Sequence, residues 1–187
     1  MLATDPLYIS PEDYLAAEAE SPIRHEYRDG EVFAMTGGTQ RHSTVILNVA
    51  SALKSRLRGS GCRTFAEGMK VRVEASNSYY YPDVVVTCSE SDRQLESQFV
   101  NQPHLIVEVL SPSTARFDRT EKFADYRAMP SVMEIVFIST ERALVEVFRR
   151  GSGDFWEQIE AGEEVVLASA SAAIGLDEIY EETDLLG

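Results

Sequence analysis

Two apolar stretches of strand length, each carrying one carboxylate, constrain this chain more than any other feature of its sequence. The first is Tyr80–Val86, which contains Asp83, and the second is His104–Leu110, in which Glu108 lies between valines. Stretches this apolar usually lie inside a sheet, where an ionised carboxylate is costly unless a cation or strong hydrogen bonds meet it. We therefore expect Asp83 and Glu108 to have a partner, and the first candidate is a divalent metal ion held by oxygen ligands.

Each of these residues also has a purely structural interpretation. Asp83 follows Pro82 near the start of a strand and could cap a turn. Glu108 could belong to a buried salt bridge. Lys122, on the helical pattern that follows, could simply pair with Asp118 four residues earlier, a contact worth only tenths of a kcal/mol on a helix surface. These alternatives remain open from the residues alone.

Length and composition indicate one globular domain over residues 1–187. Apolar residues make up 44% of the 187 residues and charged residues 26%, as in an ordinary folded domain. We find no apolar stretch near the ~20 residues of a membrane span and no signal-like N-terminus, so we expect a soluble, cytoplasmic protein without membrane partners. In that compartment Cys62 and Cys88 should be reduced thiols, and no zinc-binding spacing surrounds them.

The net charge of −14 argues against a strongly basic nucleic-acid surface. Its distribution weakens that objection, because residues 151–187 hold ten acidic residues and no Lys or Arg. Residues 1–150 are left with 21 acidic and 17 basic residues, a net charge of −4. A local basic surface is therefore compatible with the sequence.

Hydrophobic periodicity and turn residues predict an α/β fold with a mixed central sheet, flanking helices and additional C-terminal strands. A polar connection, 89–102, separates the two carboxylate strands, and residues 176–186 predict a short acidic helix or a loose tail. The remaining predicted elements are a helix over 11–20, a hairpin around Asp29-Gly30, a helix over 40–58, strands Arg63–Ala66 and Met69–Glu74 joined at Glu67-Gly68, a helix over 118–129, paired strands Met133–Ser139 and Leu144–Arg149, and weaker strands Phe155–Ile159 and Glu164–Leu167.

Several motifs resemble those of one nuclease superfamily. Pro82-Asp83 followed by Glu108 on a neighbouring strand looks like the PD-(D/E)xK pattern. The stretch 108–114, Glu-Val-Leu-Ser-Pro-Ser-Thr, with Asp118, Glu121-Lys122 and Tyr126 downstream, more specifically resembles the Uma-two family of restriction-endonuclease-like proteins. The N-terminal stretch 26–31 and His42 after a glycine pair match the same family, and the resemblance covers about residues 8–180. One position departs from the superfamily pattern, because Leu110 stands where a lysine is usual.

The resemblance implies a metal-dependent endonuclease acting on nucleic acid, with DNA as the expected partner. Asp83, Glu108 and Lys122 would be the catalytic residues, with Lys122 replacing the lysine missing at position 110 and Lys70 as the reserve. One or two Mg²⁺ or Mn²⁺ ions would be held by Asp83, Glu108 and the Val109 carbonyl, and Glu26 and His42 would complete or orient the metal's surroundings. Three arginines near the last helix could contact flanking phosphates: Arg116, Arg119 and Arg127.

Other functions also fit the sequence. A non-catalytic module that binds nucleic acid or protein on a nuclease-derived fold is favoured by Leu110 and by the acidic charge. A hydrolase or lyase that acts on a small acidic metabolite is a third alternative, but it is disfavoured. The sequence contains no nucleotide-binding loop, nucleophile elbow or zinc motif. Cutting both strands of a duplex would favour a twofold homodimer.

Overall fold

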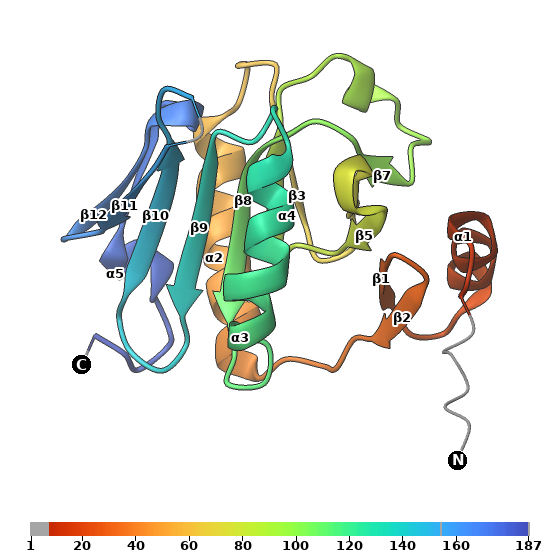
Figure 1. Ribbon diagram of the computed structural model, residues 1–187. Coiled ribbons are helices and arrows are strands. Elements are labelled where there is room, and N and C mark those ends of the chain that lie inside the picture. Colours follow the sequence, from red (N-terminus) through yellow and green to blue (C-terminus); the bar gives the residue numbers. More distant parts are fainter. Residues whose placement is uncertain (1–7, 154, 187) are drawn as a thin grey trace.

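The computed structural model describes residues 8–153 and 155–186, and its centre is a six-stranded sheet in the order β11-β10-β9-β8-β6-β3 (Figure 1). The strands β8 and β9 run parallel, and the other neighbours in this sheet are antiparallel. The mixed sheet predicted from the sequence is therefore confirmed. Its strands are β3 (Arg63–Ala66), β6 (Val84–Thr87), β8 (Pro103–Leu110), β9 (Glu134–Ser139), β10 (Val145–Arg150) and β11 (Trp156–Glu160).

A second sheet, of five short strands in the order β2-β1-β5-β4-β7, lies toward the N-terminal part of the chain (Figure 1). Its strands are β1 (His25–Arg28), β2 (Glu31–Ala34), β4 (Lys70–Val73), β5 (Ser78–Tyr80) and β7 (Phe99–Val100). A separate hairpin consists of β12 (Glu164–Leu167) and β13 (Ala172–Gly175). Short 3₁₀ turns occur at η1 (Glu74–Ser76), η2 (Ser91–Arg93) and η4 (Ala168–Ala170).

Helices cover both faces of the six-stranded sheet (Figure 1). One face is covered by α2, and the other by a continuous helical segment made of α3, a π-helical turn η3 and α4. The helical elements are α1 (Pro11–Glu20), α2 (Gln40–Arg56), α3 (Ala115–Phe117), η3 (Asp118–Lys122), α4 (Phe123–Ala128) and α5 (Leu176–Ile179). None of the helices within the described ranges has both the length and the apolar character that crossing a bilayer requires.

The alternation of residues along the strands explains which side chains face which helix. Val107 and Val109 of β8 pack into the apolar core beneath α2, whereas Ile106 and Leu110 pack into the core that contains Tyr126 of α4. Glu108 shares the parity of Ile106 and Leu110, so the alternation directs its side chain toward the α3–α4 segment. The strand pattern alone thus places this carboxylate opposite the helix that carries Lys122.

Capping residues set the starts of the helices α1 and α2. The Ser10 side chain accepts a hydrogen bond from the Asp13 backbone N–H at the start of α1. Thr39 does the same for His42 at the start of α2. The hairpin at Asp29-Gly30 is also confirmed, with both turn residues at positive φ. The start of α2 matters for the site, because Thr39 fixes the turn on which His42 lies.

The connection at Glu67-Gly68 between β3 and β4 is confirmed, but the two strands lie in different sheets, because local sequence does not specify which sheet a strand joins. β3 and β4 are not a hairpin: β3 pairs with β6, and β4 pairs with β5 and β7 in the other sheet. The turn between them contains Glu67 and Gly68 at positive φ. The polar connection 89–102 also contains a short strand, β7, which pairs in parallel with β4.

The C-terminal segment is not a loose tail, and the short acidic helix predicted within 176–186 is confirmed as α5. The segment forms β13 and α5, and Ile179 and Tyr180 are buried in the core beneath α2. The Tyr180 hydroxyl donates to the Leu144 carbonyl oxygen at 2.9 Å, and the Asn48 side chain of α2 donates to the Ile179 carbonyl. The acidic residues lie on the outside of a segment that apolar side chains hold in place.

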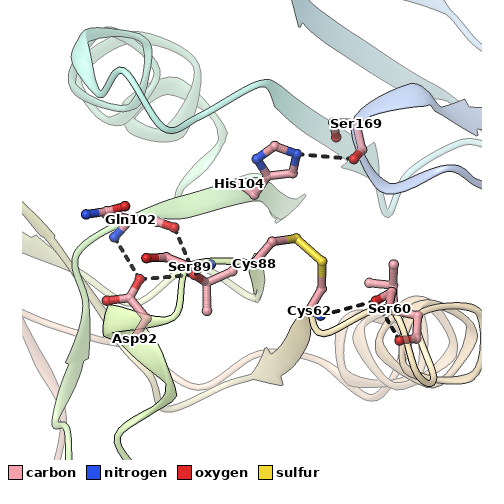
Figure 2. The surroundings of a disulfide bond; sticks show 10 residues. Ser60, Cys62, Cys88, Ser89, Asp92, Gln102, His104 and Ser169 are labelled. Carbon is pink, nitrogen blue, oxygen red and sulfur yellow. Dashed lines mark hydrogen bonds between the residues drawn. A yellow bond between two sulfur atoms is a disulfide. The ribbon is translucent and has the colours of Figure 1, made fainter.

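The prediction that the cysteines are reduced thiols is also wrong, because Cys62 and Cys88 form a disulfide (Figure 2). The two residues lie just outside the pair Arg63 and Thr87, which are directly opposite in the β3–β6 ladder. The antiparallel pairing therefore brings their Cα atoms to 4.0 Å of each other. An expectation based on cellular compartment overlooked this proximity.

Candidate active site

A single lysine lies among three carboxylates on the α3–α4 face of the six-stranded sheet. The Lys122 Nζ is 2.8 Å from Glu26 Oε1, 3.1 Å from Asp118 Oδ1 and 3.5 Å from Glu108 Oε1. All four side chains are buried. Burial by itself lowers the pKa of the Lys122 ammonium, but the carboxylates of Glu108, Glu26 and Asp118 outweigh it, and the pKa lies well above its usual value. Lys122 is therefore a permanent cation at neutral pH.

Three separate parts of the chain supply this cluster. Glu26 comes from β1, Glu108 from β8, and Asp118 and Lys122 from the π-helical turn η3. In that turn the Phe123 N–H donates to the Asp118 carbonyl, five residues back. A π-helical turn inside an α-helix is uncommon and occurs frequently at functional sites. Of the four charged residues in this turn, Asp118 and Lys122 are the two that are buried.

Glu108 is held from two sides. Besides the ammonium of Lys122, the Tyr126 hydroxyl of α4 donates to the same oxygen, Oε1, at 2.8 Å. Burial, opposed by Lys122 and reinforced by Asp118, Asp83 and Glu26, raises the pKa of Glu108 well above its usual value. Among the described residues, the hydrogen bonds and ion pairs of Glu108 all use Oε1, so its other oxygen is not engaged by them.

Asp83 lies directly before β6, next to the point where Val84 pairs with Val107. Its Oδ2 accepts a hydrogen bond from the Val109 N–H at 2.6 Å and lies 3.6 Å from His42 Nε2. Burial raises the pKa of Asp83 to about 6, although His42, the Val109 N–H and Lys122 all act in the opposite direction. Asp83, whose side chain is 17% exposed, and the buried Glu108 are thus neighbouring carboxylates whose pKa values are both raised, mainly by burial.

His42 connects α2 to this end of the sheet. Its Nε2 donates to the Val109 carbonyl oxygen at 2.9 Å, which assigns the proton of the neutral ring to Nε2. The other ring nitrogen, Nδ1, is buried and has no hydrogen-bond partner among the described residues. Gly38 packs against it so closely that a Cβ there would lie 2.7 Å from Nδ1. The lack of a side chain at Gly38 therefore leaves room for the His42 ring.

The backbone of Tyr81 also holds Glu26 in position. The Oε1 of Glu26 accepts the Tyr81 backbone N–H at 3.0 Å as well as the Lys122 ammonium. The Tyr81 hydroxyl in turn donates to Glu18 Oε1 at 2.9 Å. The Nζ of Lys70, the reserve lysine, lies 5.5 Å from the Tyr81 ring centroid, and its carboxylate neighbour is Glu18. It does not join the cluster.

The structure brings the sequence-predicted residues into one neighbourhood. Lys122 contacts Glu26 and Glu108, and His42 contacts Val109 and approaches Asp83. Sequence reasoning treated Asp118 as an ordinary surface partner and gave no role to Tyr126. The signal was present, because 118, 122 and 126 are spaced four apart and so fall on one helix face.

The arginines of the same segment have other contacts. Arg119 pairs with Glu146 of β10, and its guanidinium lies over the Phe137 ring. The Arg127 guanidinium lies over the rings of Phe123 and Trp156. These contacts place both guanidinium groups toward β9, β10 and β11, rather than beside Lys122.

Two cavities open beside the cluster, one on each side of the connection between β2 and α2. One, of about 390 Å³, is lined by Asp83, His42, Gly38 and Tyr81 among others. The other, of about 340 Å³, is lined by Glu26, Lys122, Asp118 and Phe33 among others. Met35 and Thr36 border both cavities. A ligand can therefore approach the buried charges from either side of this connection.

The donor set at Asp83 and Glu108 suits a hard divalent cation. Three carboxylates surround Lys122 and Asp83 lies nearby beside His42, so carboxylates outnumber the lysine and a further cation would balance them. No group of three or more His, Cys, Asp or Glu side chains within 8–153 and 155–186 forms a ready-made metal cluster. Mg²⁺ does not require one, because it commonly uses one or two carboxylates and takes its other ligands from water and phosphate.

A family model described as "Putative restriction endonuclease", Uma2, matches residues 11–178. The chain belongs to the Uma2 family. Two Synechocystis proteins are similar over most of their length. "Uncharacterized protein slr1290" is 32% identical over 174 residues, covering 92% of this chain and 91% of that protein. "Uncharacterized protein sll1609" is 31% identical over 145 residues, covering 77% and 82%.

The fold is also found in a solved structure. The crystal structure of a "putative nuclease belonging to DUF820" from Anabaena variabilis matches with a TM-score of 0.73 and covers 92% of this chain and 97% of that one. Its sequence identity to this chain is 18%, so the similarity concerns the fold. The restriction-endonuclease-like fold expected from the sequence is confirmed.

Proposed function

We propose that this Uma2 protein is a metal-dependent endonuclease that hydrolyses phosphodiester bonds in DNA. The observation that carries the proposal is the convergence of Asp83 and Glu108, from neighbouring strands, with a buried and permanently charged Lys122. The description of the family as a restriction endonuclease supports DNA as the substrate.

In this proposal Asp83, Glu108 and the Val109 carbonyl supply the oxygen ligands for Mg²⁺ or Mn²⁺. The ion would supply a water of lowered pKa and charge neutralisation at the phosphate. His42 orients the Val109 carbonyl through its Nε2–H, and Tyr126 orients Glu108 through its hydroxyl. Such supporting groups commonly change metal affinity or activity 10- to 100-fold.

Lys122 stabilises the negative charge that develops on the phosphate oxygens during in-line attack. In this proposal Lys122 acts as a cation and not as a general base, in keeping with the raised pKa that its three carboxylate neighbours give it. Glu26 holds Lys122 in place and is itself fixed by the Tyr81 N–H. The lysine thus reaches the phosphate as a pre-positioned cation without conformational searching.

The test is cleavage of supercoiled plasmid and of single-stranded circular DNA by purified protein with Mg²⁺ or Mn²⁺. Asp83→Asn and Glu108→Gln keep size and hydrogen bonding but remove charge, and each should lower the rate by at least about 100-fold. Glu160→Gln is the matched control, because Glu160 is exposed on the edge strand β11. An RNA of the same sequence distinguishes the two nucleic acids.

Equal nicking by all variants would refute the proposal, because the activity would not depend on the site. DNA binding without metal-dependent nicking would identify the chain as a non-catalytic binding module on this fold. Calorimetric titration with Mn²⁺ provides a readout independent of activity, and the heat of binding should disappear in Asp83→Asn.

A further inference from the structure

The cavity on the Lys122 side of the site has aromatic walls above a charged floor. Phe33 of β2 and Phe117 of α3 line it, with ring centroids 6.2 Å apart at an interplanar angle of 40°. Glu26, Asp118 and Lys122 form its charged part. Two neutral hydroxyls also line it, those of Ser113 and Thr114.

Phe33 is exposed and points to the same side as a site residue. It lies directly opposite Glu26 in the β1–β2 ladder, and directly opposite residues project from the same face of a sheet. β2 is the edge strand of its sheet, and 42% of Phe33 remains accessible to solvent. Phe33 is thus an exposed aromatic ring that lines the same cavity as the buried charges of Glu26, Asp118 and Lys122.

We infer that this cavity binds an unpaired nucleobase of the DNA strand being cut, with Phe33 as its stacking platform. The inference rests on the proposed function and names its substrate class. A base is flat and uncharged, so it can stack on Phe33 and Phe117 while its polar edge meets the hydroxyls of Ser113 and Thr114.

The two cavities place base and phosphate on opposite sides of one short connection. Met35 and Thr36 border both, so a strand with its base against Phe33 would cross this connection to bring its backbone beside Asp83 and His42. The base cavity of about 340 Å³ accommodates a single base but not a base pair with both sugars. The preferred substrate is therefore single-stranded or locally opened DNA, as for enzymes that act on extruded bases.

The test compares Phe33→Ala with wild type in binding to a labelled single-stranded oligonucleotide and to its duplex, with Ca²⁺ or EDTA in place of Mg²⁺. Loss of one base–aromatic stack should weaken single-strand binding by at least about fivefold and change duplex binding by less than about twofold. Phe33→Trp should bind like wild type, because it keeps a stacking surface. Phe155→Ala is the matched control, since Phe155 is 64% exposed and lies outside the residues that line either cavity.

A 2-aminopurine base in the strand adds a direct signal, because stacking quenches its fluorescence in wild type and not in Phe33→Ala. Three results would overturn the inference: no single-strand binding by wild type, equal binding by Phe33→Ala, or equal losses for single strand and duplex. Light scattering on the same samples tests whether β2 instead pairs with a second copy. A dimer that Phe33→Ala converts to monomer would also overturn it.

Cleavage of the same oligonucleotides with Mg²⁺ separates this inference from the proposed function. If single-strand binding depends on Phe33 but no cleavage occurs, the base-binding inference stands and the proposed nuclease function is refuted. If cleavage occurs but neither binding nor cleavage depends on Phe33, the proposed nuclease function stands and the base-binding inference is refuted.

Discussion

Replacing Lys122 by methionine isolates the charge at the centre of the site. Methionine has nearly the same length and fits a buried position, so Lys122→Met removes the cation while leaving little empty space. Three buried carboxylates then lose a partner that lies 2.8 to 3.5 Å away. At an effective dielectric constant of about 20, each such contact is worth roughly 5 kcal/mol before the desolvation of the charges is counted.

The net effect is smaller, because the lysine no longer has to be desolvated and the carboxylates can bind protons. Removing one member of a buried ion pair typically costs about 3–5 kcal/mol in the free energy of unfolding. For a chain of this size that corresponds to a fall of roughly 10 °C in melting temperature. Lys54→Met on the exposed face of α2 is the matched control and should change stability by less than about 0.5 kcal/mol.

The loss should also depend on pH in a defined direction. Burial already raises the pKa of Glu108 in the folded protein, and removing Lys122 raises it further. Between the unfolded and the folded pKa of such a group, the folded state binds more protons, so the free energy of unfolding falls as pH rises. The stability difference between Lys122→Met and wild type should therefore be smaller at pH 5 than at pH 8.

Urea unfolding followed by circular dichroism at pH 5, 6, 7 and 8 measures this difference. The pH dependence distinguishes lost charge from lost packing, because a packing defect costs the same at every pH. A loss below about 1 kcal/mol, or one that stays constant from pH 5 to 8, would refute the claim that Lys122 is the shared cation of the cluster.

Three other expectations concern the surroundings of the site. Gly38→Ala should displace the adjacent histidine and lower Mn²⁺ affinity about tenfold or more, measured by calorimetry, whereas Gly37→Ala should not, because nothing lies within 4 Å of its Cβ position. Tyr126→Phe removes a donor to a buried carboxylate and should cost about 1–3 kcal/mol in urea unfolding; no loss would contradict the hydrogen bond. Replacing Cys62 and Cys88 by serine should cost about 2–4 kcal/mol, and wild type with reductant should melt at the same temperature as that variant.

Local patterns predicted most elements because the physics that sets them is local. The Thr39 cap, the apolar face of α2 and the Asp29-Gly30 turn each depend on residues within a few positions of one another. The division of the strands between two sheets does not depend on such local residues. Nothing near Gly68 indicates that β3 and β4 separate into different sheets, since that depends on partners far along the chain.

The site shows the same division between local and distant information. An isolated glutamate in the apolar strand β8 predicted a buried carboxylate with a cationic partner, and the structure pairs Glu108 with Lys122. The contact between Asp118 and Lys122 was predicted too, but as a weak surface pair. Its burial comes from the packing of η3 against the sheet, which spacing along the helix cannot reveal.

The burial of Leu110 is consistent with the proposal that the catalytic lysine of this chain comes from a helix. The Leu110 side chain is buried in the core that contains Tyr126, so a lysine there would have to be desolvated within an apolar environment. Lys122 instead enters from the π-helical turn, which also carries Asp118 as one of its counterions. The α3–α4 segment therefore both covers the core and delivers the cation, and any change that loosens its packing should affect stability and the site together.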